Sequence, residues 1–194
     1  MRTQGNMWTN FLRLVRGLLK GKQICFIGKD VRLGVEVKLS PMVFIDDNVT
    51  IGDGTFLGYG CVIRPSTVIG KECTLGHFCV IEGCKIGNRV GIHVHCTLAI
   101  GTIVEDDVFM APYCWAGNVK NIDHGRGLNP PIEAPVLRRA ARIGGQVGIF
   151  PGVEVGENAV IGIGSLVTKN VPPREVWFGR PAEKRGSVSE REIL

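Results

Sequence analysis

The residues most able to do chemistry lie in one short run, residues 118–126. His124 could take a proton from a nucleophile near neutral pH, as an imidazole does in general base catalysis. Asp123 precedes it and could orient the ring, although neighbouring loop residues need not face each other. Asn118 carries an amide that could hold a substrate amine or polarise a carbonyl. The alternatives are an exposed loop histidine and a turn asparagine. The stretch therefore predicts a candidate site.

The other three histidines give weaker indications. His93 and His95 are two residues apart and would share one face of a strand, so together they could hold a metal. No third ligand accompanies them, and we expect no metal site. His77 would stand at a corner of the fold, where it could line a groove between subunits.

The elements that must position these residues are set by a six-residue repeat. An apolar residue, often followed by Gly, returns at every sixth position, and a small or β-branched residue follows four positions later. No helix repeats at six, and the two-residue period of a strand does not explain the paired Gly, whereas a period of six is typical of a parallel β-helix. The apolar positions are Ile27, Leu33, Ile45, Ile51, Leu57, Ile63, Ile69 and Leu75, then in a shifted phase Val80, Ile86, Ile92, Leu98, Val104 and Met110, and later Ile143, Ile149, Val155, Ile161 and Val167.

Each hexapeptide is expected to give one short strand and one turn, with its aliphatic residue pointing into the axis. The residue four positions later must be small because the core is narrow, and the Gly suits a tight turn. Stacked coils pair their backbone groups with neighbouring coils, so stability is a sum over adjacent coils. The phase shifts by one residue between Leu75 and Val80, and we expect a corner to absorb this shift.

The repeat breaks between Met110 and Ile143. The residues there have no six-residue rhythm beyond Ala116 and are rich in Gly, Asn and Pro. A long loop ejected from a rigid solenoid commonly carries function. We therefore expect an active-site loop at about residues 117–142, with His124 on it.

Composition agrees with a solenoid and limits the partners. The 194 residues suit one domain, and 27 Gly with only 7% aromatic residues suit a thin core. The net charge of +5 suggests a partner that carries phosphate. No long Lys/Arg run or alternation of basic and aromatic residues supports nucleic-acid binding.

The seven cysteines indicate core packing rather than chemistry. An odd count argues against a closed disulfide framework. The sequence also lacks the C-x-x-C spacing that would indicate a zinc site. We expect small apolar core residues in a protein of the reducing cytoplasm. Cys25 lies just before the first repeat, and the small inward positions hold Cys61, Cys73, Cys79, Cys84, Cys96 and Cys114.

The N-terminal residues 7–20 place apolar side chains at helical spacing, with Arg13, Arg16 and Lys20 among them. The apolar run is too short to span a bilayer, and the arginines interrupt what would be the core of a signal peptide. We expect an amphipathic helix that caps the first coil or packs on a neighbouring subunit; the alternative is a peripheral contact with an anionic membrane. The expected organisation is a cap over 1–26, a β-helix over 27–185 and a tail over 186–194.

Two segments near the C-terminal end resemble the closing coils of the hexapeptide-repeat acyltransferases. They are residues 143–173 and the run Phe178-Gly179-Arg180-Pro181-Ala182-Glu183-Lys184, which resembles that family's G-x-P-A-(x)-K ending. The resemblance extends over residues 27–185 and is much more specific for the superfamily than for the substrate. It implies an all-β, left-handed parallel β-helix, an exception to the usual right-handed crossover. It also implies a homotrimer with active sites in the grooves between subunits.

The resemblance further implies that acetyl-CoA lies along the last coils. Its expected contacts are Gly145, Ile163, Gly164, Lys169 and Arg180, with the two basic residues meeting phosphates. The expected catalytic residues are His124 and Asn118, and the expected acceptor-side residues are Asp123, Arg126, Arg138 and Arg139.

Two subgroups of the family compete for this chain. The run from Met110 to Asn118 resembles M-A-P-x-x-x-x-x-N of bacterial nucleotide-amino-sugar N-acetyltransferases, which would place Asn118 at the substrate amine. The pair Asp123-His124 resembles the D-H pair that supplies the base in polysaccharide O-acetyltransferases. The first match needs no length change and the second needs an insertion, so the sequence favours N-acetylation of a nucleotide-linked amino sugar for cell-surface polysaccharide. Acetylation of a sugar hydroxyl is the alternative, and a zinc-binding carbonic-anhydrase-like protein or a purely structural β-helix is another.

Overall fold

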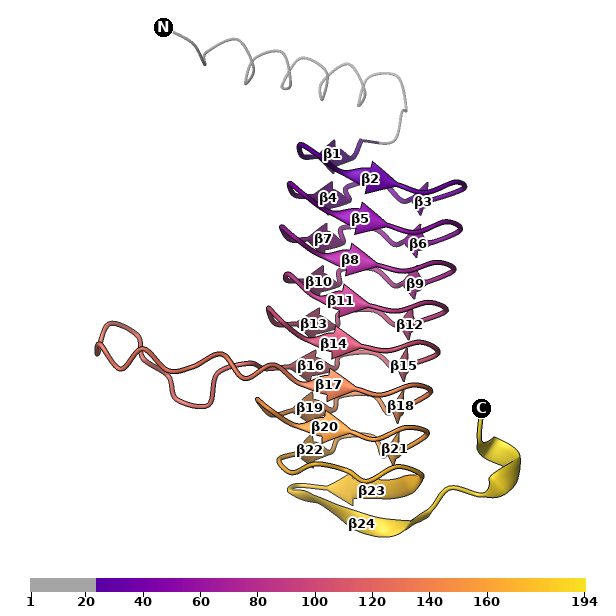
Figure 1. Ribbon diagram of the computed structural model, residues 1–194, viewed down its shortest axis with the longest axis vertical. Helices are drawn as coiled ribbons and strands as arrows, with labels where there is room; N and C mark the ends of the chain where they lie inside the picture. Colours follow the sequence, from indigo (N-terminus) through magenta and orange to yellow (C-terminus); the bar gives the residue numbers. More distant parts are fainter. Residues whose placement is uncertain (1–23) are drawn as a thin grey trace, which may run out of the picture.

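The computed structural model describes residues 24–194, and the amphipathic segment expected near the N-terminus lies outside the described residues. The described chain winds into a left-handed parallel β-helix whose strands stack into three sheets, as the sequence predicts (Figure 1). Each turn of the chain contributes one strand to each sheet, so the three sheets are the sides of a triangular prism. We call them sheets A, B and C, and the corners A–B, B–C and C–A.

The strands are two residues long until the last coil. Sheet A contains β1 (Phe26–Ile27), β4 (Phe44–Ile45), β7 (Val62–Ile63), β10 (Val80–Ile81), β13 (Thr97–Leu98), β16 (Trp115–Ala116), β19 (Gly148–Ile149) and β22 (Leu166–Val167). Sheet B contains β2 (Arg32–Leu33), β5 (Thr50–Ile51), β8 (Val68–Ile69), β11 (Lys85–Ile86), β14 (Ile103–Val104), β17 (Val136–Leu137) and β20 (Glu154–Val155). Sheet C contains β3 (Lys38–Leu39), β6 (Phe56–Leu57), β9 (Thr74–Leu75), β12 (Gly91–Ile92), β15 (Phe109–Met110), β18 (Arg142–Ile143), β21 (Val160–Ile161), β23 (Glu175–Gly179) and β24 (Ala182–Ser187).

The second residue of each short strand points into the prism. Ile63, Ile81 and Leu98 are aligned on adjacent strands of sheet A and are fully buried. The parallel register places identical positions of successive coils on top of one another, so the aliphatic residues form continuous columns. This confirms the core that the six-residue repeat predicts.

The cysteines of the repeat are buried, as expected, and their thiols also join neighbouring coils. At the C–A corner, Cys61 donates to the carbonyl of Gly76 at 2.9 Å and Cys79 donates to that of His93 at 3.0 Å. Cys114 continues the series to Gly144 at 3.0 Å. A small side chain with a donor therefore satisfies an inward-facing corner carbonyl that an aliphatic residue would leave unpaired.

The shift in the repeat lies later than the sequence suggested. Leu75 and Ile81 are both inward residues six positions apart, so the register is still intact at Val80, which points outward. The next inward residue, Ile86, comes one position early because the A–B corner between β10 and β11 is one residue short. Gly83 makes this shorter turn with φ of +53°.

Two segments depart from the prism (Figure 1). A long loop leaves the A–B corner after β16 and returns at β17, so it spans residues 117–135 and is shorter at its end than expected. At the closing end, β23 pairs with β21 and turns back as β24, and the chain then runs through a short 3-10 helix, Glu190–Glu192. Within residues 24–194, no helix is long and apolar enough to cross a membrane.

Candidate active site

The base of the loop is held to the coils on both sides of it. The Asn118 side-chain amide donates to the carbonyl of Ile100 in the coil before the loop, at 2.9 Å. Glu133, on the returning arm, donates its N–H to the Asn118 carbonyl at 2.8 Å and accepts from Gly152 N–H of the following coil at 2.6 Å. Lys120 Nζ lies 2.6 Å from Glu133 Oε2. We call Asn118, Lys120, Glu133 and Gly152 the clasp.

The tip of the loop is a tight turn that presents His124. Asp123 accepts a hydrogen bond from Leu128 N–H at 2.8 Å through its carboxylate, and from Arg126 N–H at 3.2 Å through its carbonyl. The Arg126 guanidinium donates to the carbonyls of Asp123 and His124 at 3.1 and 3.2 Å. His124 has φ of +40° and is exposed. The carboxylate of Asp123 therefore fixes the turn rather than the imidazole ring.

His124 is available for chemistry in a way that Asn118 is not. No side chain of residues 24–194 forms a hydrogen bond with its ring, whereas the side-chain N–H of Asn118 is already bound to Ile100. The loop to which His124 belongs, residues 117–135, projects away from the prism (Figure 1).

The residues expected to contact acetyl-CoA lie mostly at the C–A corner of the last coils. Gly145 and Gly164 stand on adjacent coils, and Gly164 N–H donates to the Gly145 carbonyl at 2.8 Å. Ile163 beside them is 79% exposed, and Arg180 follows β23 at the same end. Lys169 follows β22 and is at the A–B corner instead. Four of the five residues thus lie at or beside one corner, and Lys169 is separate from them within the chain.

Arg138 and Arg139 lie at the B–C corner and are already paired. Arg138 bridges Glu105 at 2.8 Å and Glu154 at 2.7 Å. The Arg138 guanidinium holds the pKa of Glu154 below its usual range. Arg139 donates to Glu157 and to the carbonyl of Leu194, each through its guanidinium. The structure does not bring these arginines to His124 within one chain.

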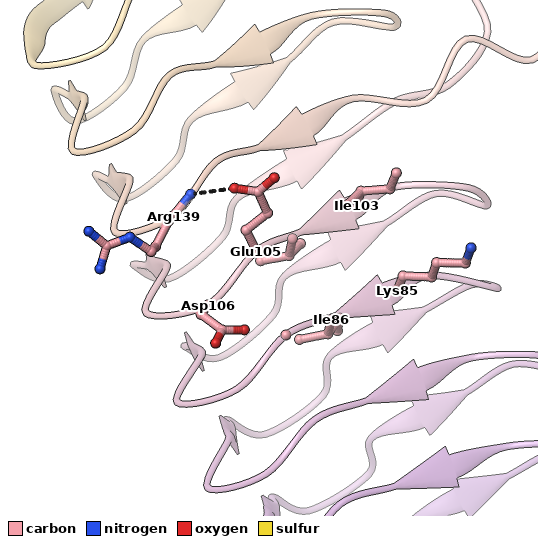
Figure 2. Close-up of a pocket in the computed structure, with 8 residues that line it drawn as sticks. Lys85, Ile86, Ile103, Glu105, Asp106 and Arg139 are labelled. Atoms are coloured by element: carbon pink, nitrogen blue, oxygen red, sulfur yellow. Dashed lines mark hydrogen bonds between the residues drawn. The ribbon is translucent and has the colours of Figure 1, made fainter.

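The same region of sheet B and the B–C corner contains an open hollow of about 440 Å³ (Figure 2). Lys85 and Ile103 stand on one side of it, and Glu105, Asp106 and Arg139 on the other, where Glu105 accepts from the Arg139 N–H. Its two carboxylates are already engaged in hydrogen bonds, and its lining contains no histidine, cysteine, serine or threonine. We therefore do not place the reaction there.

Sequence reasoning missed a column of stacked rings at the C–A corner. His95 lies between Phe78 and Tyr113, with ring centroids 5.2 and 5.0 Å away and planes within 17°. In the earlier coils of the same corner, His77 accepts a hydrogen bond from Tyr59 N–H through Nδ1, at 2.9 Å. The repeat itself contains the signal, because these residues occupy equivalent corner positions in successive coils. His93 and His95 are thus at another corner from His124, and no three His, Cys, Asp or Glu side chains of residues 24–194 converge as metal ligands would.

Two families of repeats match the chain. Residues 48–83 match "Bacterial transferase hexapeptide (six repeats)", and residues 141–169 match "Hexapeptide repeat of succinyl-transferase". Galactoside O-acetyltransferase of Lactococcus lactis is 29% identical in an alignment of length 133, which covers 59% of this chain and 63% of the relative. Galactoside O-acetyltransferase of Escherichia coli is 46% identical over 50 residues, 26% of this chain and 25% of the relative. The chain thus spans less than two thirds of the length of these relatives.

Solved structures share the fold. UDP-N-acetylglucosamine acyltransferase of Francisella novicida superposes with a TM-score of 0.74 at 20% identity, over 84% of this chain and 62% of that one. AntD, an N-acyltransferase from Bacillus cereus solved in complex with dTDP and coenzyme A, gives 0.60 at 19% identity, over 91% and 90%. Together with the repeats and the ejected loop, these findings define a hexapeptide-repeat β-helix protein. In its repeats and its fold, the chain is similar to the hexapeptide-repeat acyltransferases.

Proposed function

We propose that this protein transfers the acetyl group of acetyl-CoA to a hydroxyl of a sugar, with His124 as the general base. The observation that carries the proposal is the imidazole of His124, exposed on a loop that hydrogen bonds hold at both its base and its tip. The galactoside O-acetyltransferases among the sequence relatives support the same reaction class.

The reaction requires one proton relay and one carbonyl addition. His124 takes the proton of the acceptor hydroxyl while that oxygen attacks the thioester carbon. The tetrahedral oxyanion needs hydrogen-bond donors, which backbone N–H groups supply most readily. When the C–S bond breaks, the imidazolium returns the proton to the sulfur, which gives the acetyl ester and free coenzyme A. No acyl-enzyme is formed, so no cysteine is needed as a nucleophile.

A hydroxyl is favoured over an amine because of Asn118. N-acetylation of a nucleotide-linked amino sugar, which the run from Met110 to Asn118 indicates, would use the Asn118 amide at the substrate amine. That amide donates to Ile100 at the base of the loop. The exposed base His124, which a neutral amine would not require, has no such engagement. The N-acetylation of a nucleotide sugar for cell-surface polysaccharide therefore stays as the second candidate.

We further propose that the protein acts as a homotrimer in the cytoplasm, where acetyl-CoA is made. Every outward strand residue of sheet A is uncharged, from Phe26 to Leu166. The adjoining C–A corner exposes Phe78, Tyr113 and Ile163 by 54, 56 and 79%. The B–C corner instead carries ion pairs such as Arg89 with Asp107. Sheet A and the C–A corner are thus the surface suited to contact other copies of the chain. The C–A corner of a neighbouring copy would then supply the acetyl-CoA site that faces His124.

The test is a screen of acceptors with acetyl-CoA, following release of free thiol. Galactosides and other neutral sugars should support turnover, and the product should lose its acetyl group in mild alkali, as an ester does and an amide does not. His124→Ala should lower turnover by about a hundredfold or more, as expected for loss of a general base. An alkali-stable product from a nucleotide-linked amino sugar would overturn O-acetylation and support the second candidate, N-acetylation. No thiol release with any acceptor would overturn both.

A further inference from the structure

The clasp at the base of the loop is built around one residue, Glu133. Its backbone N–H binds the outgoing arm at Asn118, its carbonyl binds Gly152 in the next coil, and its carboxylate pairs with Lys120 at 2.6 Å. Gly152 has φ of +73°, and a Cβ there would lie 3.0 Å from Glu133 Oε2. The position therefore favours Gly both for its backbone conformation and for the approach of the carboxylate.

These contacts restrict the loop from both sides. Asn118 attaches the outgoing arm to the coil before the loop, and Gly152 attaches the returning arm to the coil after it. The Lys120–Glu133 pair then joins the two arms just outside the corner. Residues 121–132 beyond the pair contact the helix through none of these bonds, so the direction of the whole projecting segment is set at the clasp.

We propose that Lys120 and Glu133 are positioning residues for His124: their ion pair sets the direction in which the loop leaves the helix, and thus where the imidazole stands. This inference rests on the proposed function. It adds two residues that act without touching the sugar acceptor or acetyl-CoA. Small displacements of a catalytic group are costly, because the reacting atoms must be held in one geometry. A change of direction at the base of a long loop is magnified at its tip.

The stability of the fold does not depend on this pair. Its side chains are 54 and 38% exposed, and pairs of this kind contribute little to folding. The chain offers a matched control at the same A–B corner, Arg64 with Asp46 at 2.8 Å, with exposures of 52 and 36%. The two pairs share corner, exposure and chemistry, and only one of them joins the arms of the loop.

The experiment compares Lys120→Met, Glu133→Met, the charge-swapped Lys120→Glu with Glu133→Lys, and the control Arg64→Met. Each single clasp variant should lower kcat by roughly tenfold, as expected for a misplaced base, while KM for acetyl-CoA is unchanged. The melting temperature should move by less than about 2 °C, as for loss of an exposed pair. The swapped pair should recover most of the lost kcat, and Arg64→Met should match the wild type.

Two further readouts separate this inference from the proposed function. Adding Glu133→Met to His124→Ala should cost less than about twofold more, because the pair acts through His124. Cleavage after Arg126 by an Arg-specific protease should be several times faster in Glu133→Met than in the wild type or the control, whether or not the protein transfers acetyl groups. Unchanged kcat and unchanged cleavage in the clasp variants would overturn the inference, as would a full tenfold loss on the His124→Ala background. Wild-type protein without transfer activity would overturn the proposed function, and the cleavage comparison would still decide whether the pair directs the loop.

Discussion

The carboxylate of Asp123 lies 2.8 Å from the backbone N of Leu128 and accepts its hydrogen. This bond closes the turn that contains His124, so the residue before the histidine acts on the backbone of the turn. A side-chain amide has the same acceptor oxygen as the carboxylate at this position. The two substitutions Asp123→Asn and Asp123→Ala therefore test different things.

Asp123→Asn should keep most of the wild-type kcat, because its amide oxygen can still accept from Leu128. Asp123→Ala should lower kcat by about tenfold, since the turn that holds His124 is no longer closed. Steady-state kinetics of the two variants, with circular dichroism as the check on folding, makes the comparison. An equal loss in both would show that the charge matters and that Asp123 acts on the imidazole after all.

Lys169→Ala combined with Arg180→Ala should raise KM for acetyl-CoA by about tenfold or more, because hydrogen bonds to charged groups are worth about 1.5–3 kcal/mol. The expected partners are the phosphates of the donor. Initial rates at varied acetyl-CoA give the value, with Arg64→Ala as a control away from the last coils. An unchanged KM would mean that these two residues do not meet the donor.

Val80→Asp should dissociate the proposed trimer, because it places a charge in the middle of the uncharged outward face of sheet A. Ile103→Asp makes the same change on the outward face of sheet B and should leave the assembly intact. Light scattering coupled to size-exclusion chromatography gives the mass of each variant. A wild-type monomer at micromolar concentration, or a trimer that survives Val80→Asp, would contradict the assignment of this face.

The native protein should expose at most one reactive thiol, at Cys25, which is half-buried. The other six cysteines are buried, and burial raises the pKa of the Cys73 thiol and raises that of Cys84 to about 12. A thiol reagent at pH 8 should therefore modify one group before denaturation and seven after it. Rapid native reaction of more than one thiol would show that the coils open far more readily than the packed core implies.

Thermal stability should fall as the pH is lowered below about 4, the usual pKa range of exposed carboxyl groups. Hydrogen bonds from the backbone and side chain of Asn88, with Arg89 nearby, lower the pKa of Asp106, and Arg138 lowers that of Glu154. A carboxyl group whose pKa is lower in the folded than in the unfolded state stabilises the fold at pH values above its unfolded pKa. This stabilisation is lost as the pH falls through its folded pKa. Melting temperatures between pH 7 and pH 3 should decline less steeply for Asp106→Asn. If the melting temperatures of Asp106→Asn and the wild type fell in parallel, Asp106 would not contribute to the loss of stability in acid.

Most of the fold could be predicted because the repeat encodes it directly. One inward aliphatic residue such as Ile63 or Leu98 in each hexapeptide fixes a strand, and the turn after it fixes the corner. The position of the phase shift was less predictable. Val80 and Ile81 are both apolar, so the sequence alone does not say which of them points inward, and the shift lies at Gly83 rather than before them.

The site could be predicted only in outline. The loss of the repeat predicts a loop with His124 on it, but hydrogen bonds within that loop depend on how its arms meet. Neither the role of Glu133 nor the bond from Asn118 to Ile100 has a local signature, because each joins residues 13 or more positions apart. The pairing of Arg138 with Glu105 and Glu154 likewise comes from stacking of coils distant in sequence.

The A–B corner is where the chain changes length in both directions. Between β10 and β11 it is one residue short, and between β16 and β17 it holds residues 117–135. In both places the strands above and below remain in register, as Ile81 with Leu98 and Val104 with Leu137 show. Insertions and deletions at this corner are thus decoupled from the core, and a loop with its own chemistry could be transplanted to another A–B corner without redesigning the helix. The fold separates the part that must be conserved for assembly from the part that is free to diverge toward new acceptors.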